Sequence, residues 1–275
     1  MSSQDVNEAL LSQLLDAGDP APVTVVNPSG SAAAVIICDH GGDAIPIKLD
    51  GLGLDPNDRL RHIAWDIGAS AIAYQLSRKL DAPTVLGSFS RLVIDLNRPP
   101  YDLTSVREIS DGVLVPGNRN LSSKDMAQRI ASIFEPYHGE IAAAMERAAQ
   151  HVAAPALVSV HSFTPVMKGF ERPWHIGVLF GSDMRIAKPL MAALSKKPEI
   201  SVGENKPYSG YDLYGYSVET HAMPNGYPNI LLEIRQDLID THYGVAKWAA
   251  IIANALAPIL DDKALYQPLL PDEPK

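Results

Sequence analysis

Two histidines and an aspartate are the side chains best suited to bind a metal ion. His40 and Asp43 stand three residues apart on a Gly-Gly turn, and His161 follows another apolar run. Imidazole nitrogen and carboxylate oxygen bind zinc at roughly 2.0–2.2 Å, and two histidines with one carboxylate leave a position open for water. The glycines let the backbone turn tightly, so both side chains can reach one ion. The pattern predicts a catalytic divalent metal, zinc, at these residues; the alternative is a plain turn and a hydrogen-bonded core histidine.

A carboxylate inside an apolar run is the second chemical signal. Glu233 interrupts the run 230–234, where a carboxylate is costly to bury unless it is paired or coordinated. Beside a metal, it could take a proton from water and return it to a leaving nitrogen. The alternative is an ion pair with Arg235 or another arginine. Asp66 is read most simply as a helix N-cap, or else as an acceptor that orients a ligand histidine.

Arginines near the end of another apolar run suggest an anion site. Arg91, Asn97 and Arg98 lie in the segment RLVIDLNRP. The planar guanidinium holds a carboxylate bidentately, and one arginine could instead stabilise the oxyanion of a tetrahedral intermediate. Surface salt bridges are the alternative for these arginines.

The elements that would position these groups alternate along the chain. Strands are expected at 33–38, 84–86, 91–96, 157–160, 175–180 and 230–234, and helices at 5–16, 66–80, 122–150 with a break at Pro136, 184–194 and 241–260. This order predicts an α/β fold with a mostly parallel or mixed sheet flanked by helices. Ligands bind at the carboxyl ends of such strands, where the polar groups collect.

We expect one domain over residues 1–275. Its core would span about 33–260, with the helix at 5–16 and the Pro-rich tail at 267–275 peripheral. The long loops 97–120 and 198–226 are rich in Pro and Gly, and loops of this length commonly shape a site.

Composition limits the classes of function. A net charge of −9 argues against nucleic acid as a partner, although a few arginines in a cleft could still attract an acidic small molecule. The single cysteine, Cys38, excludes an intrachain disulfide. No signal peptide or membrane span is expected, so the cytoplasm is the expected compartment. The oligomeric state stays open.

Five motifs together resemble the N-formylglutamate amidohydrolase (deformylase) family. They are HGGDAIP at 40, DIGA at 66, RLVIDLNRP at 91, HSFTP at 161 and LLEIRQDL at 231. The resemblance spans about residues 33–260. It implies a phosphorylase/hydrolase-like fold similar to the zinc carboxypeptidases, whose ligand pattern would map onto His40, Asp43 and His161. Asp43 stands where those enzymes have glutamate, one methylene longer.

The resemblance also implies a reaction and roles for the other residues. An N-formyl or N-acyl amino acid, such as N-formylglutamate, would be hydrolysed to formate or another acid and the amino acid. Glu233 would be the general acid/base, and Arg91 would hold the oxyanion. Substrate carboxylates would bind Asn97, Arg98 and Arg235, and the second long loop, with Tyr208 and Tyr211, would close over the substrate. A carboxypeptidase or amidase acting on another acyl group, and a binding protein that has lost the metal, are the competing interpretations.

Overall fold

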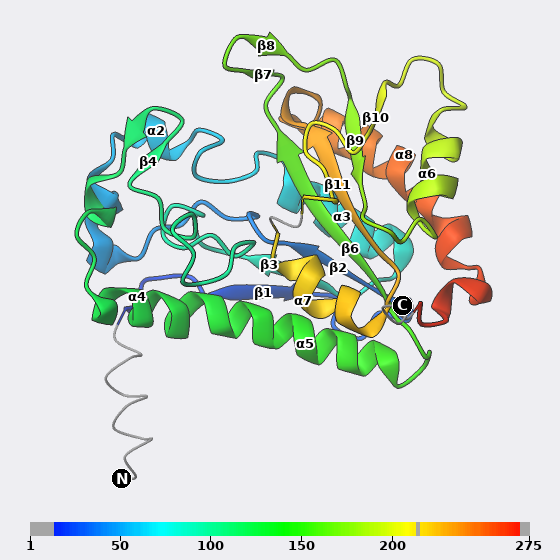
Figure 1. The fold of residues 1–275 in the computed structure, drawn as a ribbon, viewed down its shortest axis with the longest axis horizontal. Coiled ribbons are helices and arrows are strands. Elements are labelled where there is room, and N and C mark those ends of the chain that lie inside the picture. The colour runs from blue at the N-terminus through cyan, green and yellow to red at the C-terminus, as the bar shows by residue number, and fades with distance from the viewer. Residues whose placement is uncertain (1–13, 213–214, 270–275) are drawn as a thin grey trace, which may run out of the picture.

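A mixed sheet of seven strands forms the centre of the computed structural model, which describes residues 14–212 and 215–269 (Figure 1). The strand order is β1-β3-β2-β6-β11-β9-β10. Strands β3, β2, β6 and β11 are mutually parallel, whereas β1 and β9 pair antiparallel with β3 and β11. The strands are β1 Val23–Val26, β2 Ala34–Cys38, β3 Thr84–Gly87, β6 Ala156–Phe163, β9 Ile176–Leu179, β10 Val202–Glu204 and β11 Asn229–Arg235.

This sheet confirms the α/β prediction and five of the six predicted strands. Most of the helix predicted at 5–16, and much of the tail at 267–275, lie outside the described residues.

Helices cover both faces of the sheet, as Figure 1 shows. Successive residues of β2 point to opposite faces: Ile36 packs in the cluster that includes residues of α3 and α8, whereas Val35 and Ile37 pack with residues of α5. The main helices are α3 Ala69–Leu80, α4 Ser123–Arg129, α5 Glu135–Ala149, α6 Ala187–Leu194 and α8 His242–Leu260. A strand buried on both faces explains why the sequence shows a continuous apolar run there.

The helix predicted at 122–150 is interrupted, as expected, near Pro136. A capping box between Ser122 and Asp125 starts α4. A π-helical turn, η3 (Ile130–Phe134), then joins α4 to α5, with the Glu135 N–H bonded to the Ile130 carbonyl. Proline has no N–H to donate to the preceding turn, so a regular helix cannot continue unchanged through it.

The prediction of a strand at 91–96 is wrong. This segment is buried but runs through turns, and its backbone carbonyls bond to side chains rather than to a neighbouring strand. Arg129 donates to the Val93 carbonyl at 2.8 Å, and Asn118 donates to the Leu92 carbonyl at 2.8 Å. Burial alone therefore produced the apolar pattern.

Helix α8 is long and apolar enough to cross a membrane by length and composition. Its mean hydropathy reaches 1.4 over an 18-residue window. One face of α8, including Trp248, Ile252 and Leu256, is buried in the core beside α3 and α6. Packing in the core accounts for this composition.

The two long loops contain only short elements. In the first, β4 (Ile109–Ser110) and β5 (Val113–Leu114) form a hairpin, and in the second α7 (Ser217–His221) is the main helix. The remaining elements are β7 Val166–Met167, β8 Phe170–Glu171, α2 Pro56–Arg59, and the 3-10 turns η1 Ile47–Gly53, η2 Pro116–Asn118, η4 Met223–Asn225, η5 Gln236–Leu238 and η6 Lys263–Tyr266.

Candidate active site

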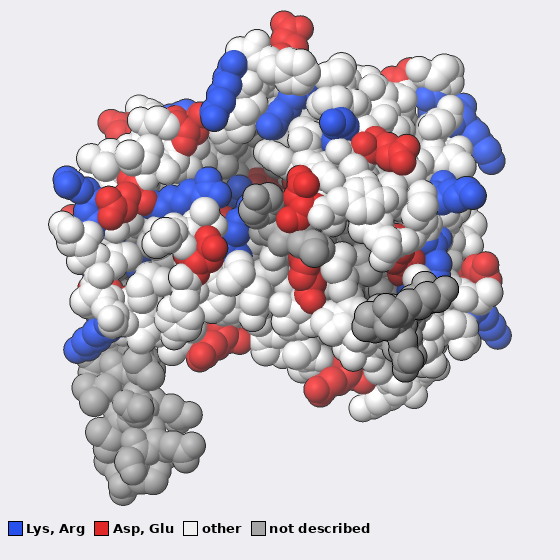
Figure 2. Space-filling view, viewed as in Figure 1, with Lys and Arg blue, Asp and Glu red and all other residues white. Residues whose placement is uncertain are grey.

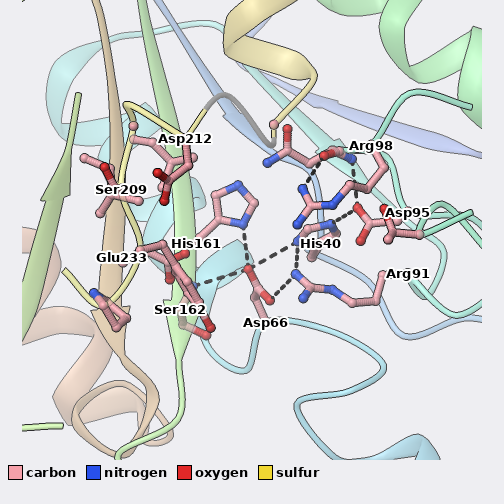
Figure 3. A pocket seen from close by; sticks show the side chains of 18 of the residues that line it. His40, Asp66, Arg91, Asp95, Arg98, His161, Ser162, Ser209, Asp212 and Glu233 are labelled. Atoms are coloured by element: carbon pink, nitrogen blue, oxygen red, sulfur yellow. Dashed lines mark hydrogen bonds and ion pairs between the residues drawn. The ribbon is translucent and has the colours of Figure 1, made fainter. Parts of the chain in front are cut away.

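Three neighbouring parallel strands bring their polar groups to one place. His40 follows the end of β2, His161 lies near the end of β6, and Glu233 lies near the end of β11. Glu233 and His161 are register partners on adjacent strands. Figure 3 shows the two imidazoles with Asp66 between them and Glu233 close to His161. The sheet therefore gathers these side chains at its carboxyl edge, as the strand order requires.

A carboxylate joins the two histidines, and it belongs to Asp66. His161 Nδ1 donates to Asp66 Oδ2 at 2.7 Å, and His40 Nδ1 lies 3.5 Å from the same oxygen. One ligand atom from each of the three residues lies within 4.8 Å of the others, and all three residues are buried.

The second nitrogen of each imidazole is held by another buried aspartate. His40 Nε2 donates to Asp95 Oδ1 at 2.7 Å, and His161 Nε2 donates to Asp39 Oδ2 at 3.0 Å. Burial opposes ionisation of both aspartates, but the hydrogen bonds and charges of the histidines outweigh it and keep each pKa far below its usual range. Each ring is thereby fixed with its Nδ1 turned toward Asp66.

These residues fit a divalent metal ion. Two imidazole nitrogens and a carboxylate form a donor set that zinc accepts, and carboxylates behind ligand histidines are usual at such sites. Burial acts to lower the pKa of His161, but the hydrogen bonds and charges of Asp39 and Asp66 raise it to about 10. The ring therefore carries a proton on both nitrogens, and a bound ion would replace one of these protons. Arg91 Nη2 donates to His40 Nδ1 and, at 2.7 Å, to Asp66 Oδ1. Its side chain is 28% exposed and lines the cavity, which leaves it room to yield to an ion.

Asp43 is not where the His-x-x-Asp spacing predicted it. Its side chain is exposed, and among the described residues it belongs to no cluster of potential metal ligands. The glycines serve close packing instead, because a Cβ on Gly42 would collide with the Ser88 carbonyl. Ala44 then forms a parallel bridge with Phe89, which ties this turn to the segment 88–90.

Asp66 is not the N-cap of α3. The N-cap is Gly68, whose φ of +80° places it in the left-handed region, and the Asp66 backbone carbonyl accepts from the Ala69 N–H. The Asp66 side chain is free to accept from His161, Arg91 and, at 3.3 Å, the Ser162 N–H. The second interpretation of Asp66, as an acceptor for a ligand histidine, matches this geometry, and its position also suits a ligand.

Glu233 has the features of a general acid/base. Burial raises its pKa to about 7, against the opposing charge of His161. It lines the cavity, and its Oε2 is buried without a hydrogen-bond partner among the described residues. Among the described residues Glu233 forms no ion pair with an arginine, and Arg235 instead bonds to Asp237 at 2.8 Å. A carboxyl group with a pKa near neutrality can both accept and return a proton.

The site opens into a cavity of about 850 Å³ with an uneven distribution of charge. Among the described residues, three arginines and one lysine line it: Arg91, Arg98, Arg107 and Lys168. In Figure 3, Arg91 and Arg98 lie on one side of the imidazoles, and Asp212 lies on the side of Glu233. In Figure 2 a group of basic side chains lies to the left of the central hollow, with acidic ones around it, and acidic side chains lie to its right. An anion would bind on the arginine side.

Other predicted substrate-binding residues divide into two groups. Tyr208 lines the cavity, and Arg172 Cζ lies over its ring at 5.3 Å from the ring centroid. Arg235 and Tyr211 are not among the lining residues. Asn97 also lines the cavity. Its side-chain Oδ1 accepts from the backbone N–H groups of Tyr216 and Ser217 at the start of α7, so this oxygen has a structural role.

Sequence reasoning assigned no role to Asp39 or Asp95. Asp95 interrupts an apolar run in the same way as Glu233, so the same signal would have found it. Asp39 directly precedes His40, and nothing local shows that it binds the more distant His161. Arg107 and Lys168 carry no local signal either.

Residues 32–240 match the family model FGase, described as N-formylglutamate amidohydrolase. The comparison with curated proteins gave no match.

Two solved structures are similar over most of the chain. The crystal structure of gene product Atu2144 from Agrobacterium tumefaciens has 31% sequence identity and a TM-score of 0.86, and the match covers 90% of this chain and 98% of that one. The N-formylglutamate amidohydrolase from Ralstonia eutropha JMP134 has 19% identity and a TM-score of 0.70, covering 88% and 98%. The second match shows a shared fold.

Proposed function

The chain belongs to the N-formylglutamate amidohydrolase family, and from that premise we propose that it is a metal-dependent enzyme that hydrolyses the amide bond of an N-formyl or N-acyl amino acid. The observation that carries the proposal is the convergence of His40, Asp66 and His161 with Glu233 at a cavity that bears arginines on one side. The products would be formate, or another carboxylic acid, and the free amino acid.

The metal would be zinc or another divalent ion, held by His40, Asp66 and His161. When bound, it would act as a Lewis acid on the amide carbonyl and lower the pKa of water. Asp95 and Asp39 keep the imidazoles in the orientation that such binding needs.

Glu233 would carry the proton. Its unpaired Oε2 takes a proton from the attacking water and returns it to the leaving nitrogen, so that amide and water give acid and amine. Arg91 lies beside the same atoms and can donate N–H groups to the developing oxyanion.

Cations at the cavity would bind the substrate's carboxylates. Arg98 and Arg107 line it from the first long loop, and a bidentate guanidinium suits an acidic amino acid such as glutamate. The partner is thus an acidic small molecule, and an enzyme with one buried cysteine, Cys38, suits the cytoplasm.

A substrate and metal screen tests this function. The protein, purified without chelator, is assayed for amino-acid release from N-formyl-glutamate, N-formyl-aspartate, N-formyl-methionine and N-acetyl-glutamate with zinc, cobalt or manganese added. We expect turnover of at least one acidic substrate, abolished by a chelator and restored by metal. A protein that binds metal tightly but hydrolyses none of them would contradict the proposal.

A further inference from the structure

An uncovered leucine marks the floor of the cavity. Leu231 lies in β11, which is flanked by β6 on one side and β9 on the other. Its neighbours Ile230 and Leu232 are completely buried, yet Leu231 is partly exposed and lines the cavity. An apolar side chain in the middle of a sheet can be accessible only through that space.

The apolar floor is continuous with the proposed proton carrier. Glu233, Leu231 and Asn229 alternate along the same face of β11, and all three line the cavity. At about 3.3 Å per residue, Leu231 lies roughly 7 Å along the strand from Glu233, and the polar Asn229 ends the row about 7 Å further on. Leu179, the register partner of Leu231, widens the floor on β9.

The walls above this floor are also apolar. Phe180, Val218 and Met223 line the cavity, and Met223 Cε would lie 3.4 Å from a Cβ on Gly181. The carboxylates Asp212 and Glu219 line it as well, in the segment that supplies Val218. Carboxylates repel an anion, so this half suits a neutral apolar group, while the arginines attract the charged part of a substrate.

We propose that this apolar half binds the acyl chain, so that the preferred substrates are N-acyl amino acids with a neutral aliphatic chain of several carbons. The inference rests on the proposed function and specifies its substrate class. A cavity of about 850 Å³ lies in the upper part of the range that encloses drug-sized ligands, well beyond the needs of a formyl group on a small amino acid.

A chain-length series tests the inference with the wild-type protein. The value of kcat/KM is measured for N-formyl-, N-acetyl-, N-butyryl- and N-hexanoyl-glutamate under one metal condition. We expect a rise of about fourfold per added methylene while the chain stays on the apolar floor. The inhibition constant of hexanoate should also be at least about tenfold lower than that of acetate. Because neither acid is hydrolysed, this comparison measures binding of the chain alone.

A substitution at the floor locates the effect. Leu231→Phe should lower the ratio of kcat/KM for N-hexanoyl- to N-formyl-glutamate by about tenfold or more, because the larger ring fills the space. Leu269→Phe, the same change at an exposed leucine outside the cavity, should leave this ratio unchanged.

Three results would overturn the inference. One is a kcat/KM that is flat or falls from N-formyl to N-hexanoyl, with N-formyl-glutamate turned over well; the proposed function would then stand. Another is an unchanged ratio in a folded Leu231→Phe protein. Absence of hydrolysis for every member, N-formyl included, would instead remove the proposed function and this inference with it.

Discussion

Asp39 holds His161 through one carboxylate oxygen while its other oxygen is itself fixed. Asp39 Oδ2 accepts from His161 Nε2 at 3.0 Å, and Oδ1 accepts from the hydroxyls of Ser217 at 2.6 Å and Tyr137 at 2.9 Å. Asp39 is completely buried. Asp39, held by residues of α5 and α7, therefore fixes the orientation of the imidazole that β6 carries into the candidate metal centre.

Replacing Asp39 should weaken metal binding without removing a ligand. In Asp39→Asn, the carboxamide cannot support the His161 ring as a carboxylate does, so we expect zinc affinity to fall about 10–100-fold. Competition with a chromophoric chelator measures this. Asp240→Asn, at an exposed aspartate, is the control, and an affinity within twofold of wild type for Asp39→Asn would contradict the role.

The structure and the local sequence spacing differ on which carboxylate is the metal ligand. Asp66→Asn should lose zinc affinity by at least about a hundredfold, since a ligand is removed, while Asp43→Asn should bind as wild type does. Bound metal is measured by elemental analysis after purification without chelator. Loss of metal in the Asp43 variant, with metal retained in the Asp66 variant, would reverse the assignment.

Glu233 should be needed for turnover and not for metal. Glu233→Gln keeps the size of the side chain and removes its proton transfer, so kcat should fall about 10²–10⁴-fold with metal content unchanged. Glu204→Gln, at an exposed position on β10, is the matched control. Wild-type rates in Glu233→Gln would exclude it as the proton carrier.

Local sequence predicted the parts of the site that strands position. Apolar runs define where β2, β6 and β11 end, and parallel strands end at the same edge, so His40, His161 and Glu233 could be expected together. The structure does bring these three side chains together.

Residues carried by loops could not be placed in this way. Contacts between residues far apart in sequence set these positions: the Asp66 N–H donates to the His40 carbonyl, and Gly42 packs against Ser88. The segment 91–96 has the apolar composition of a strand, but bonds from Arg129 and Asn118 determine its path. Apolar periodicity reports burial, and it does not distinguish a buried turn from a strand.

Arg129 should stabilise the loop that carries Arg91 and Arg98. It is 1% exposed and donates to Val93 O, to Asn118 Oδ1 at 2.7 Å and to Gly117 O at 3.1 Å. Arg129→Met leaves these acceptors without a donor and should lower the free energy of unfolding by about 3–5 kcal/mol.

Urea denaturation measures this loss. The control is Arg78→Met at an exposed position of α3, where a change below about 0.5 kcal/mol is expected. Equal stability of the two variants would show that the loop does not depend on Arg129.

His138 should make the fold sensitive to mild acid. Its Nε2 donates to the Leu96 carbonyl at 2.8 Å, and its Nδ1 lies 3.0 Å from His221 Nε2. Burial, with the neighbouring His221 and against the charge of Asp39, lowers the pKa of His138 to about 4. Below pH 6.5 the unfolded chain then binds a proton that the folded chain does not, so stability falls as pH drops from about 6.5 to 4.

The pH dependence of unfolding distinguishes this effect from other titrations. Between pH 7.5 and 4.5, wild type should lose about 2–3 kcal/mol more than His138→Gln, which cannot titrate. His151→Gln, at an exposed histidine, should follow wild type. The buried aspartates act at lower pH because their pKa values are depressed and their unfolded values lie near 4, and the raised pKa of His161 acts between about 6.5 and 10. Glu233, whose pKa is raised to about 7, adds stability as pH falls through the measured range, but it titrates in both proteins and cancels in the comparison. Parallel stability curves for wild type and His138→Gln would show that His138 is not the acid-sensitive group.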